Sequence, residues 1–123
     1  MSTNLKSNKV KVVRLSRATL ELLAVQSQKY GFNQSEYITA LISVMNDTKI
    51  DKVFKSTAGQ LLYLPEFQVS KSQRLPKTLK LSLECIDALH KQLERYNLSH
   101  TQYLSVLIWL NFKGILKLTV RRR

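Results

Sequence analysis

Cysteine, glycine and acidic residues are scarce in this sequence. Its 123 residues include one cysteine, Cys85. A single cysteine excludes an internal disulfide framework and fits a reducing compartment, so we expect a cytoplasmic protein. The 3 glycines form no Gly-rich phosphate-binding loop. Neither a nucleophile motif nor a paired set of acidic side chains is present, so we expect a protein that is not an enzyme and needs no cofactor.

Signals for metal binding and membrane insertion are also missing. His90 and His100 have no plausible metal-ligand spacing with Cys85, so we expect no metal site. The longest uninterrupted apolar run, Val106 to Leu110, is far shorter than the roughly 20 residues of a membrane span. Residues 1–9 are polar and lack the apolar segment of a signal peptide.

The shortage of acidic residues leaves a strong positive charge. With 20 basic and 8 acidic side chains, the net charge is +12, which favours a polyanionic partner, nucleic acid first and an acidic membrane surface second. A membrane-surface helix needs Lys or Arg along its polar face. The helix expected over 17–30 has only Arg17 and Lys29, and the helix expected over 33–46 has neither residue type. The sequence therefore favours nucleic acid and predicts no membrane partner.

One segment of the chain is written twice. A shift of 66 residues places Lys77–Ser82 on Lys11–Ser16, and the frame continues without a gap. Identical residues then recur mainly at apolar positions, as in the pairs Leu23/Leu89, Gln26/Gln92, Tyr30/Tyr96, Tyr37/Tyr103 and Leu41/Leu107. The repeat predicts two copies of one unit, at 10–46 and 76–112, joined by a linker at 47–75. A polar arm (1–9) and a basic tail (113–123) flank them.

Each copy begins with a predicted short strand. Residues 10–16 are rich in β-branched side chains and partly alternate, as do residues 76–82. In the first copy Leu15 and Val13 share one face, while Arg14 and Val12 share the other. In the second copy Thr78 and Lys80 lie opposite the leucines.

A first helix follows each strand. Ser16 and Ser82 are expected to cap helices that run to about Tyr30 and Tyr96. Gly31 and Asn97, which follow these tyrosines, are the residue types that best accept a left-handed conformation. The expected apolar stripes are Leu20, Leu23 and Ala24 in the first copy and Ile86, Leu89 and Leu93 in the second.

A second helix in each copy starts with a capping box. Asn33 with Glu36, and Ser99 with Gln102, have the spacing of a cap and its reciprocal partner. Broad apolar faces of helical period follow both boxes. One strand and two such helices cannot build a stable core alone, but two copies can.

This order of elements resembles the ribbon-helix-helix family of DNA-binding proteins, the MetJ- and Arc-like group. Two copies in one chain are similar to the TraY-type accessory proteins of conjugative-plasmid relaxosomes. The resemblance implies a mainly α fold with a two-stranded antiparallel β-ribbon, in which the tandem copies form an intramolecular pseudo-dimer.

The resemblance also implies how such a protein binds double-stranded DNA. The ribbon enters the major groove, and its outward side chains read bases: Val12, Arg14, Thr78 and Lys80. The starts of the second helices contact phosphates: Asn33, Gln34, Ser35, Ser99, His100 and Thr101. Apart from the resemblance, Lys11 and Lys77 lie on the inward side of the strands, but their long side chains are expected to reach phosphates. Further expected partners are a relaxase or another relaxosome protein, and neighbouring copies side by side on DNA.

Two cellular roles stay open at this stage, an origin-of-transfer-binding relaxosome accessory protein and a plasmid-borne transcriptional repressor. A rival from another class is an antitoxin-like interaction module that grips a partner through Leu61–Leu64. We expect Leu61–Pro65 to pack on the core or to form a contact surface, Ser70–Gln73 to be loose, and the basic tail to be mobile.

Overall fold

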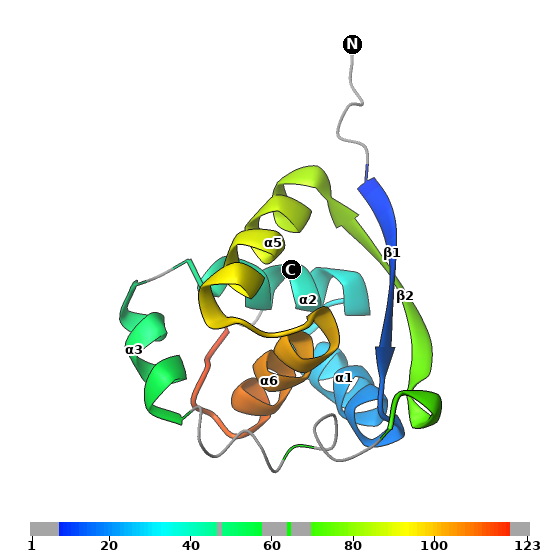
Figure 1. Ribbon diagram of the computed structural model, residues 1–123. Coiled ribbons are helices and arrows are strands. Elements are labelled where there is room, and N and C mark those ends of the chain that lie inside the picture. Colours follow the sequence, from blue (N-terminus) through cyan, green and yellow to red (C-terminus); the bar gives the residue numbers. More distant parts are fainter. Residues whose placement is uncertain (1–7, 47, 58–63, 65–69, 119–123) are drawn as a thin grey trace.

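A mainly helical body carries a two-stranded antiparallel sheet along one edge (Figure 1). This computed structural model describes residues 8–46, 48–57, 64 and 70–118. The strands begin one or two residues earlier than the sequence predicts. The elements are β1 (Asn8–Leu15), α1 (Arg17–Tyr30), α2 (Gln34–Val44), α3 (Thr48–Thr57), the 3₁₀ helix η3 (Lys71–Gln73), β2 (Leu75–Ser82), α5 (Leu83–Tyr96) and α6 (His100–Phe112).

The strands pair as the repeat predicts. β1 and β2 are antiparallel neighbours, with Val12 opposite Thr78 and Lys11 opposite Leu79. Their side chains alternate between two faces. The inner face packs on the helices and buries Val13, Leu15, Leu79 and Leu81. The outer face, as we call it from here on, is exposed and consists of Val10, Val12, Arg14, Pro76, Thr78 and Lys80.

Serine side chains start the first helices at the junctions with the strands. Ser16 Oγ accepts a hydrogen bond from the Thr19 amide at 3.2 Å, and Ser82 Oγ accepts one from the Cys85 amide at 3.0 Å. Both predicted caps are confirmed. The predicted ends are confirmed as well, because Gly31 has φ of 78° and Asn97 has φ of 55°.

Both capping boxes form at the starts of the second helices. Asn33 Oδ1 accepts from the Glu36 amide at 2.8 Å, and Glu36 Oε1 accepts from the Asn33 amide at 2.9 Å. The Ser99–Gln102 box closes in the same way at 3.1 and 3.3 Å. These reciprocal bonds satisfy amides that the helix itself leaves unpaired.

The elements of the two copies interlock. α1 packs against α6 and α2, while α2 packs against α5. α2 also contacts β2, and α6 contacts β1, so each second helix meets the strand of the other copy. One hydrophobic core results, and its fully buried side chains come from both copies: Leu23, Tyr37, Leu41, Leu89, Tyr103 and Leu107.

A buried polar cluster overturns part of the predicted helix stripe. Ala24 is exposed, whereas Gln26 is 2 % exposed. Gln26 Nε2 donates to Asn111 Oδ1 at 2.8 Å, and the Tyr37 hydroxyl donates to the same oxygen at 2.6 Å. Asn111 Nδ2 donates to the Tyr30 hydroxyl at 3.1 Å. α1 therefore turns a hydrogen-bonded face, rather than a purely apolar one, toward α6.

Packing positions Cys85 and Trp109. Cys85 is buried, and burial raises the pKa of its thiol. Trp109 is partly buried and its Nε1–H donates to Thr19 Oγ1 at 3.0 Å, which ties α6 to α1.

The linker contributes a helix to the core. Phe54 of α3 is buried against the rings of Tyr96 and Tyr103, with centroid distances of 4.2 and 5.8 Å. The Tyr96 hydroxyl donates to Asp51 at 2.6 Å. Burial and this carboxylate raise the pKa of Tyr96 to about 12. Leu64 is buried in the same core, while the rest of the predicted contact segment, residues 61–63 and 65, lies outside the described residues.

Two flanking segments are more ordered than the sequence suggests. Ser70–Gln73 forms a short 3₁₀ turn, closed by a 3.0 Å bond from the Gln73 amide to the Ser70 carbonyl. The expectation of a mobile tail is wrong for residues 113–118. Leu116 is 1 % exposed, and its carbonyl accepts a bond from Asn111 Nδ2 at 2.8 Å. Arg121–Arg123 lie outside the described residues.

Candidate nucleic-acid interface

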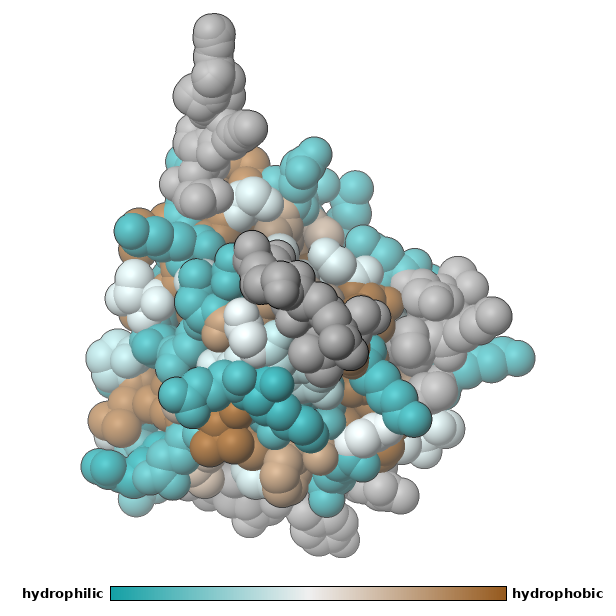
Figure 2. Space-filling view, turned by 180° about the vertical axis from the view of Figure 1, so that it is seen from behind, coloured by the Kyte–Doolittle hydropathy of each residue, from teal (hydrophilic) through white to brown (hydrophobic). Residues whose placement is uncertain are grey.

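The outer face of the ribbon gathers the four predicted base-reading residues. Val12 and Thr78 are cross-strand partners at its centre, and both are exposed. Lys80 lies opposite Val10, and Arg14 lies opposite Pro76, toward the two ends. Seen from behind, the edge of the molecule that carries the ribbon mixes hydrophilic and apolar side chains (Figure 2). The chain thus presents two cations and a hydroxyl beside apolar side chains on one strip.

Arg14 is held at one end of this strip. Its Nη2 donates to the Arg74 carbonyl at 3.1 Å, a bond across 60 residues of sequence. This bond holds the guanidinium group of Arg14 beside the residue that precedes β2. A guanidinium has five N–H donors, so donors remain for a ligand after this single bond.

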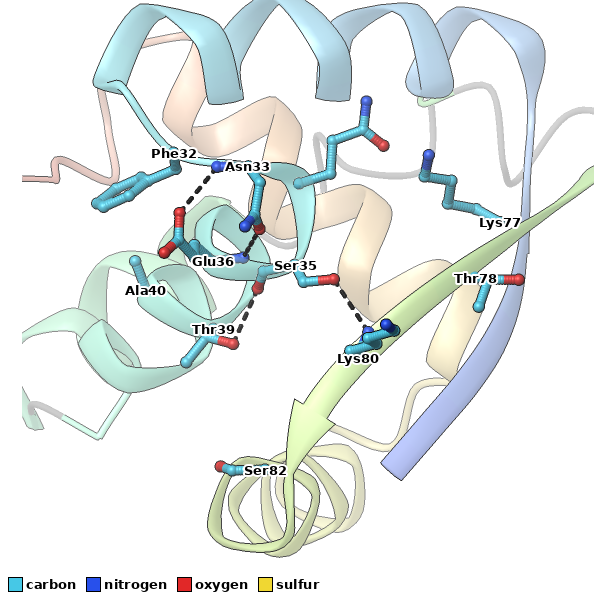
Figure 3. Close-up of a pocket in the computed structure, with 11 residues that line it drawn as sticks. Phe32, Asn33, Ser35, Glu36, Thr39, Ala40, Lys77, Thr78, Lys80 and Ser82 are labelled. Atoms are coloured by element: carbon cyan, nitrogen blue, oxygen red, sulfur yellow. Dashed lines mark hydrogen bonds between the residues drawn. The ribbon is translucent and has the colours of Figure 1, made fainter. Parts of the chain in front are cut away.

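A groove runs between the start of α2 and β2. We call it the α2 groove; Figure 3 shows its side chains. The Lys80 amide donates to Ser35 Oγ at 2.9 Å, which fixes the first turn of α2 against the strand. The predicted phosphate-contacting and base-reading residues in its lining are Asn33, Gln34, Ser35, Lys77, Thr78 and Lys80.

A second groove lies between the start of α6 and β1. We call it the α6 groove. Thr101 Oγ1 donates to the Arg14 carbonyl at 2.9 Å. Thr101 is equivalent to Ser35, and Arg14 to Lys80, in the 66-residue repeat. The same pair of positions is therefore bonded in both grooves, but the Ser35 hydroxyl accepts from a strand amide and the Thr101 hydroxyl donates to a strand carbonyl. The residues that line this groove are Lys11, Val12, Val13, Arg14, Arg74, Ser99, His100 and Thr101.

Both grooves have the electrostatics of an anion site. The first turn of a helix directs unpaired amides outward and carries the positive end of its dipole. Lys77 and Lys80 stand beside the start of α2, and Lys11 and Arg14 beside that of α6. The α2 groove includes one carboxylate, Glu36, which caps its own helix. The lining of the α6 groove has no acidic side chain.

His100 is less exposed than its neighbour His90. His90 is exposed, but His100 is partly buried, and its ring meets the His90 ring edge-on at a centroid distance of 5.6 Å. Its buried Nε2 has no hydrogen-bond partner among the described residues. Burial, then the charge of Lys11 and then His90, lower the pKa of His100.

Arg74 lines the α6 groove but was not predicted from the sequence. It precedes β2 in a segment that has no counterpart in the first copy, so the repeat gives no signal for it. The pairing of Leu75 with Leu15 brings it beside Arg14 in the α6 groove. Its basic side chain in a lysine- and arginine-rich region was the one available clue.

Other site types find no support within the described part of the chain. No three His, Cys, Asp or Glu side chains there are grouped to hold a metal ion. No helix there is both long and apolar enough to cross a membrane. No family model matches the chain, and neither a curated protein nor a solved structure matches it significantly.

Proposed function

We propose that this protein binds double-stranded DNA sequence-specifically by inserting its β-ribbon into the major groove. The observation that carries the proposal is the outer face, where Val12, Arg14, Thr78 and Lys80 project together between two basic grooves. A major groove about 12 Å wide admits a two-stranded ribbon. The net charge of +12 supports attraction to phosphates. Such binding needs neither cofactor nor catalysis.

The chemistry of each outward side chain gives it a role. Arg14 offers a planar fork for guanine O6 and N7, and Lys80 offers a point charge for the same acceptors. Thr78 contacts a thymine methyl or exchanges a hydrogen bond with a base edge, whereas Val12 makes only apolar contacts. Lys11, Lys77 and the two helix starts hold the flanking phosphates. These phosphate contacts set the register of the ribbon, while the outer face supplies the specificity.

We also propose that the two copies form an intramolecular pseudo-dimer of the ribbon-helix-helix type. The paired strands, the equal lengths of α1 and α5 and the two capping boxes at equivalent positions support it. So do the crosswise contacts of α2 with β2 and of α6 with β1. One chain would then present a complete reading head.

For the cellular role we favour an origin-of-transfer-binding accessory protein of a relaxosome, on the resemblance of the tandem arrangement. Retention of DNA fragments from its own replicon tests this role. Capture of the transfer-origin fragment supports it. Capture of only the promoter of its own gene would replace it with autoregulatory repression, and leave the DNA-binding proposal intact.

The test of DNA binding is selection of sites from random double-stranded DNA with the full chain. We expect a defined consensus, and affinity for it should fall with salt at a slope of about −0.9 per phosphate contact. Arg14→Ala and Lys80→Ala should each relax the consensus near one end. Recovery of unselected sequence with ordinary salt dependence would show non-specific binding and sink the specificity claim. The absence of any binding at low salt would sink the function itself.

A further inference from the structure

The α6 groove places a titratable ring among fixed positive charges. His100 is the first residue of α6. The charged and titratable groups that face it are Lys11 and Arg14 from β1, Arg74 ahead of β2, and His90 from α5. No acidic residue lies in the first turn of α6. No acidic side chain in this lining neutralises a protonated His100 ring, so an anion from outside the protein is needed to stabilise the imidazolium.

One ring nitrogen of His100 is left unsatisfied by the described residues. Nε2 is buried and makes no hydrogen bond with the described residues. Burial and the neighbouring Lys11 charge disfavour the protonated ring and lower the pKa of His100 in the free protein. A phosphate oxygen in the groove reverses both effects once the ring turns an N–H toward it, because the oxygen then accepts a hydrogen bond and supplies the opposite charge.

We propose that His100 takes up a proton from solvent when a DNA phosphate occupies the α6 groove, so that DNA affinity is proton-linked at one end of the ribbon. The proposal rests on the proposed function. In the free protein the His100 ring is neutral. When DNA binds, the ring takes one proton from solvent, and the resulting imidazolium pairs with one phosphate charge. Binding therefore tightens as the pH falls, as linkage requires when the complex holds more protons than the free partners.

The opposite end has no such linkage. The equivalent of His100 in the α2 groove is Gln34, and the equivalent of His90 is Ala24, neither of which titrates. Gln34 Oε1 also lacks a hydrogen-bond partner among the described residues, so the two positions each leave a polar atom unsatisfied but differ in chemistry. At the position of α6 equivalent to Glu36 stands the neutral Gln102, which closes the capping box there. One of the two grooves therefore responds to pH.

The experiment measures affinity for a fixed duplex, at constant ionic strength, between pH 5.5 and 8. The wild-type chain should bind about tenfold more tightly at the acidic end, the effect expected of one charge-assisted hydrogen bond. His100→Gln places the residue of the α2 groove in the α6 groove and should remove this dependence. His90→Ala, matched to Ala24, should keep it.

A direct readout comes from the histidine ring resonances, titrated with and without DNA. The pKa of His100 should rise on binding in the wild-type chain. If His100→Gln keeps the full pH dependence, or the His100 resonance titrates identically in both states, the inference is wrong although DNA binding stands. If no DNA binds at any pH, the proposed function fails instead. Thermal unfolding of each variant confirms that it is folded.

Discussion

Val12 and Thr78 face each other across the ribbon, and they are also the same position of the internal repeat, because 78 − 12 = 66. An axis that exchanges the two copies would therefore pass between these two side chains. Arg14 and Lys80 then lie at equal distances on either side of it. The centre of the outer face carries one apolar and one hydroxyl side chain. A bound DNA site is therefore expected to depart from two-fold symmetry at its central base pairs.

Replacing Val12 by Thr should make the recognised site more symmetric. The variant presents threonine at both central positions, and each can then exchange a hydrogen bond with a base. Selection from random DNA should give a more palindromic consensus than the wild-type chain does. Val12 is 57 % exposed, so unfolding should shift by less than about 0.5 kcal/mol. Thr78→Val is the reciprocal control and should change the same central bases.

Truncation of the outward cations should weaken specific binding. Arg14→Ala and Lys80→Ala should each cost about 1–3 kcal/mol against the selected site, because each removes a contact to base edges. Fluorescence anisotropy with cognate and scrambled duplexes measures the difference. Lys52→Ala is the charge-matched control, since Lys52 is exposed on α3, on the far side of the body from the ribbon (Figure 1). An equal loss in all three variants would contradict a reading role.

Lys11 and Lys77 are expected to act through charge alone. Lys11→Gln should weaken cognate and scrambled DNA by similar factors and reduce the magnitude of the salt slope by about 0.9. Lys77→Gln should do the same at the other groove. The measurement is a series of binding curves at several salt concentrations. A loss confined to the cognate duplex would mean that these side chains reach the bases.

The buried Asn111 cluster should matter for stability. Asn111→Leu leaves Gln26 and the Tyr37 hydroxyl without their acceptor inside the core. Each unsatisfied group costs about 1–3 kcal/mol, which urea unfolding would detect. Asn46→Ala is the control, because Asn46 is exposed and Gln92 keeps its 2.9 Å bond to the Ile42 carbonyl. Equal destabilisation by the two changes would show that the Asn111 network contributes little.

Acid should destabilise the DNA-free protein partly through His100. The pKa of this ring is lower when the protein is folded than the ordinary value of about 6.5. As the pH falls, His100 therefore becomes protonated in the unfolded chain before it does in the folded protein. The free energy of unfolding then decreases at pH values below the ordinary pKa. The urea midpoints at pH 7.5 and 5.5 should therefore differ more in the wild-type chain than in His100→Gln. The comparison cancels the contribution of the carboxylates, which both proteins share.

Local hydrogen-bonding chemistry made much of this fold predictable. Ser16, Asn33 and Ser99 act within three residues of themselves, so their caps can be identified in the sequence. The exposed side of the ribbon followed from strict alternation. The Gln26–Asn111 bond could not be predicted, because it joins residues 85 apart whose meeting depends on the packing of α1 on α6. Ala24 was wrongly predicted to be part of the buried stripe for the same reason. The buried position on α1 is taken instead by Gln26, whose polar side chain is hydrogen-bonded to Asn111.

The residues of the candidate site also differ in how far they could be predicted from the sequence. Positions on the strands were predictable from parity, and those at the helix starts from capping. Arg74 and the burial of His100 depend on how a strand of one copy meets a helix of the other, which no short window of sequence records. Leu116 illustrates the limit for the tail, because it is buried in a core built from both copies and its carbonyl accepts a bond from Asn111.

Because β1 pairs with β2 of the same chain, assembling the ribbon is a unimolecular step that dilution cannot reverse. A ribbon shared between two chains dissociates as protein becomes scarce, and its occupancy on a target then varies with the square of the concentration. If one chain binds its target alone, as the proposed function has it, occupancy of an unsaturated target would follow the first power. A cell holding only a few copies would keep each of them competent, and a twofold change in expression would change the occupancy of an unsaturated target no more than twofold.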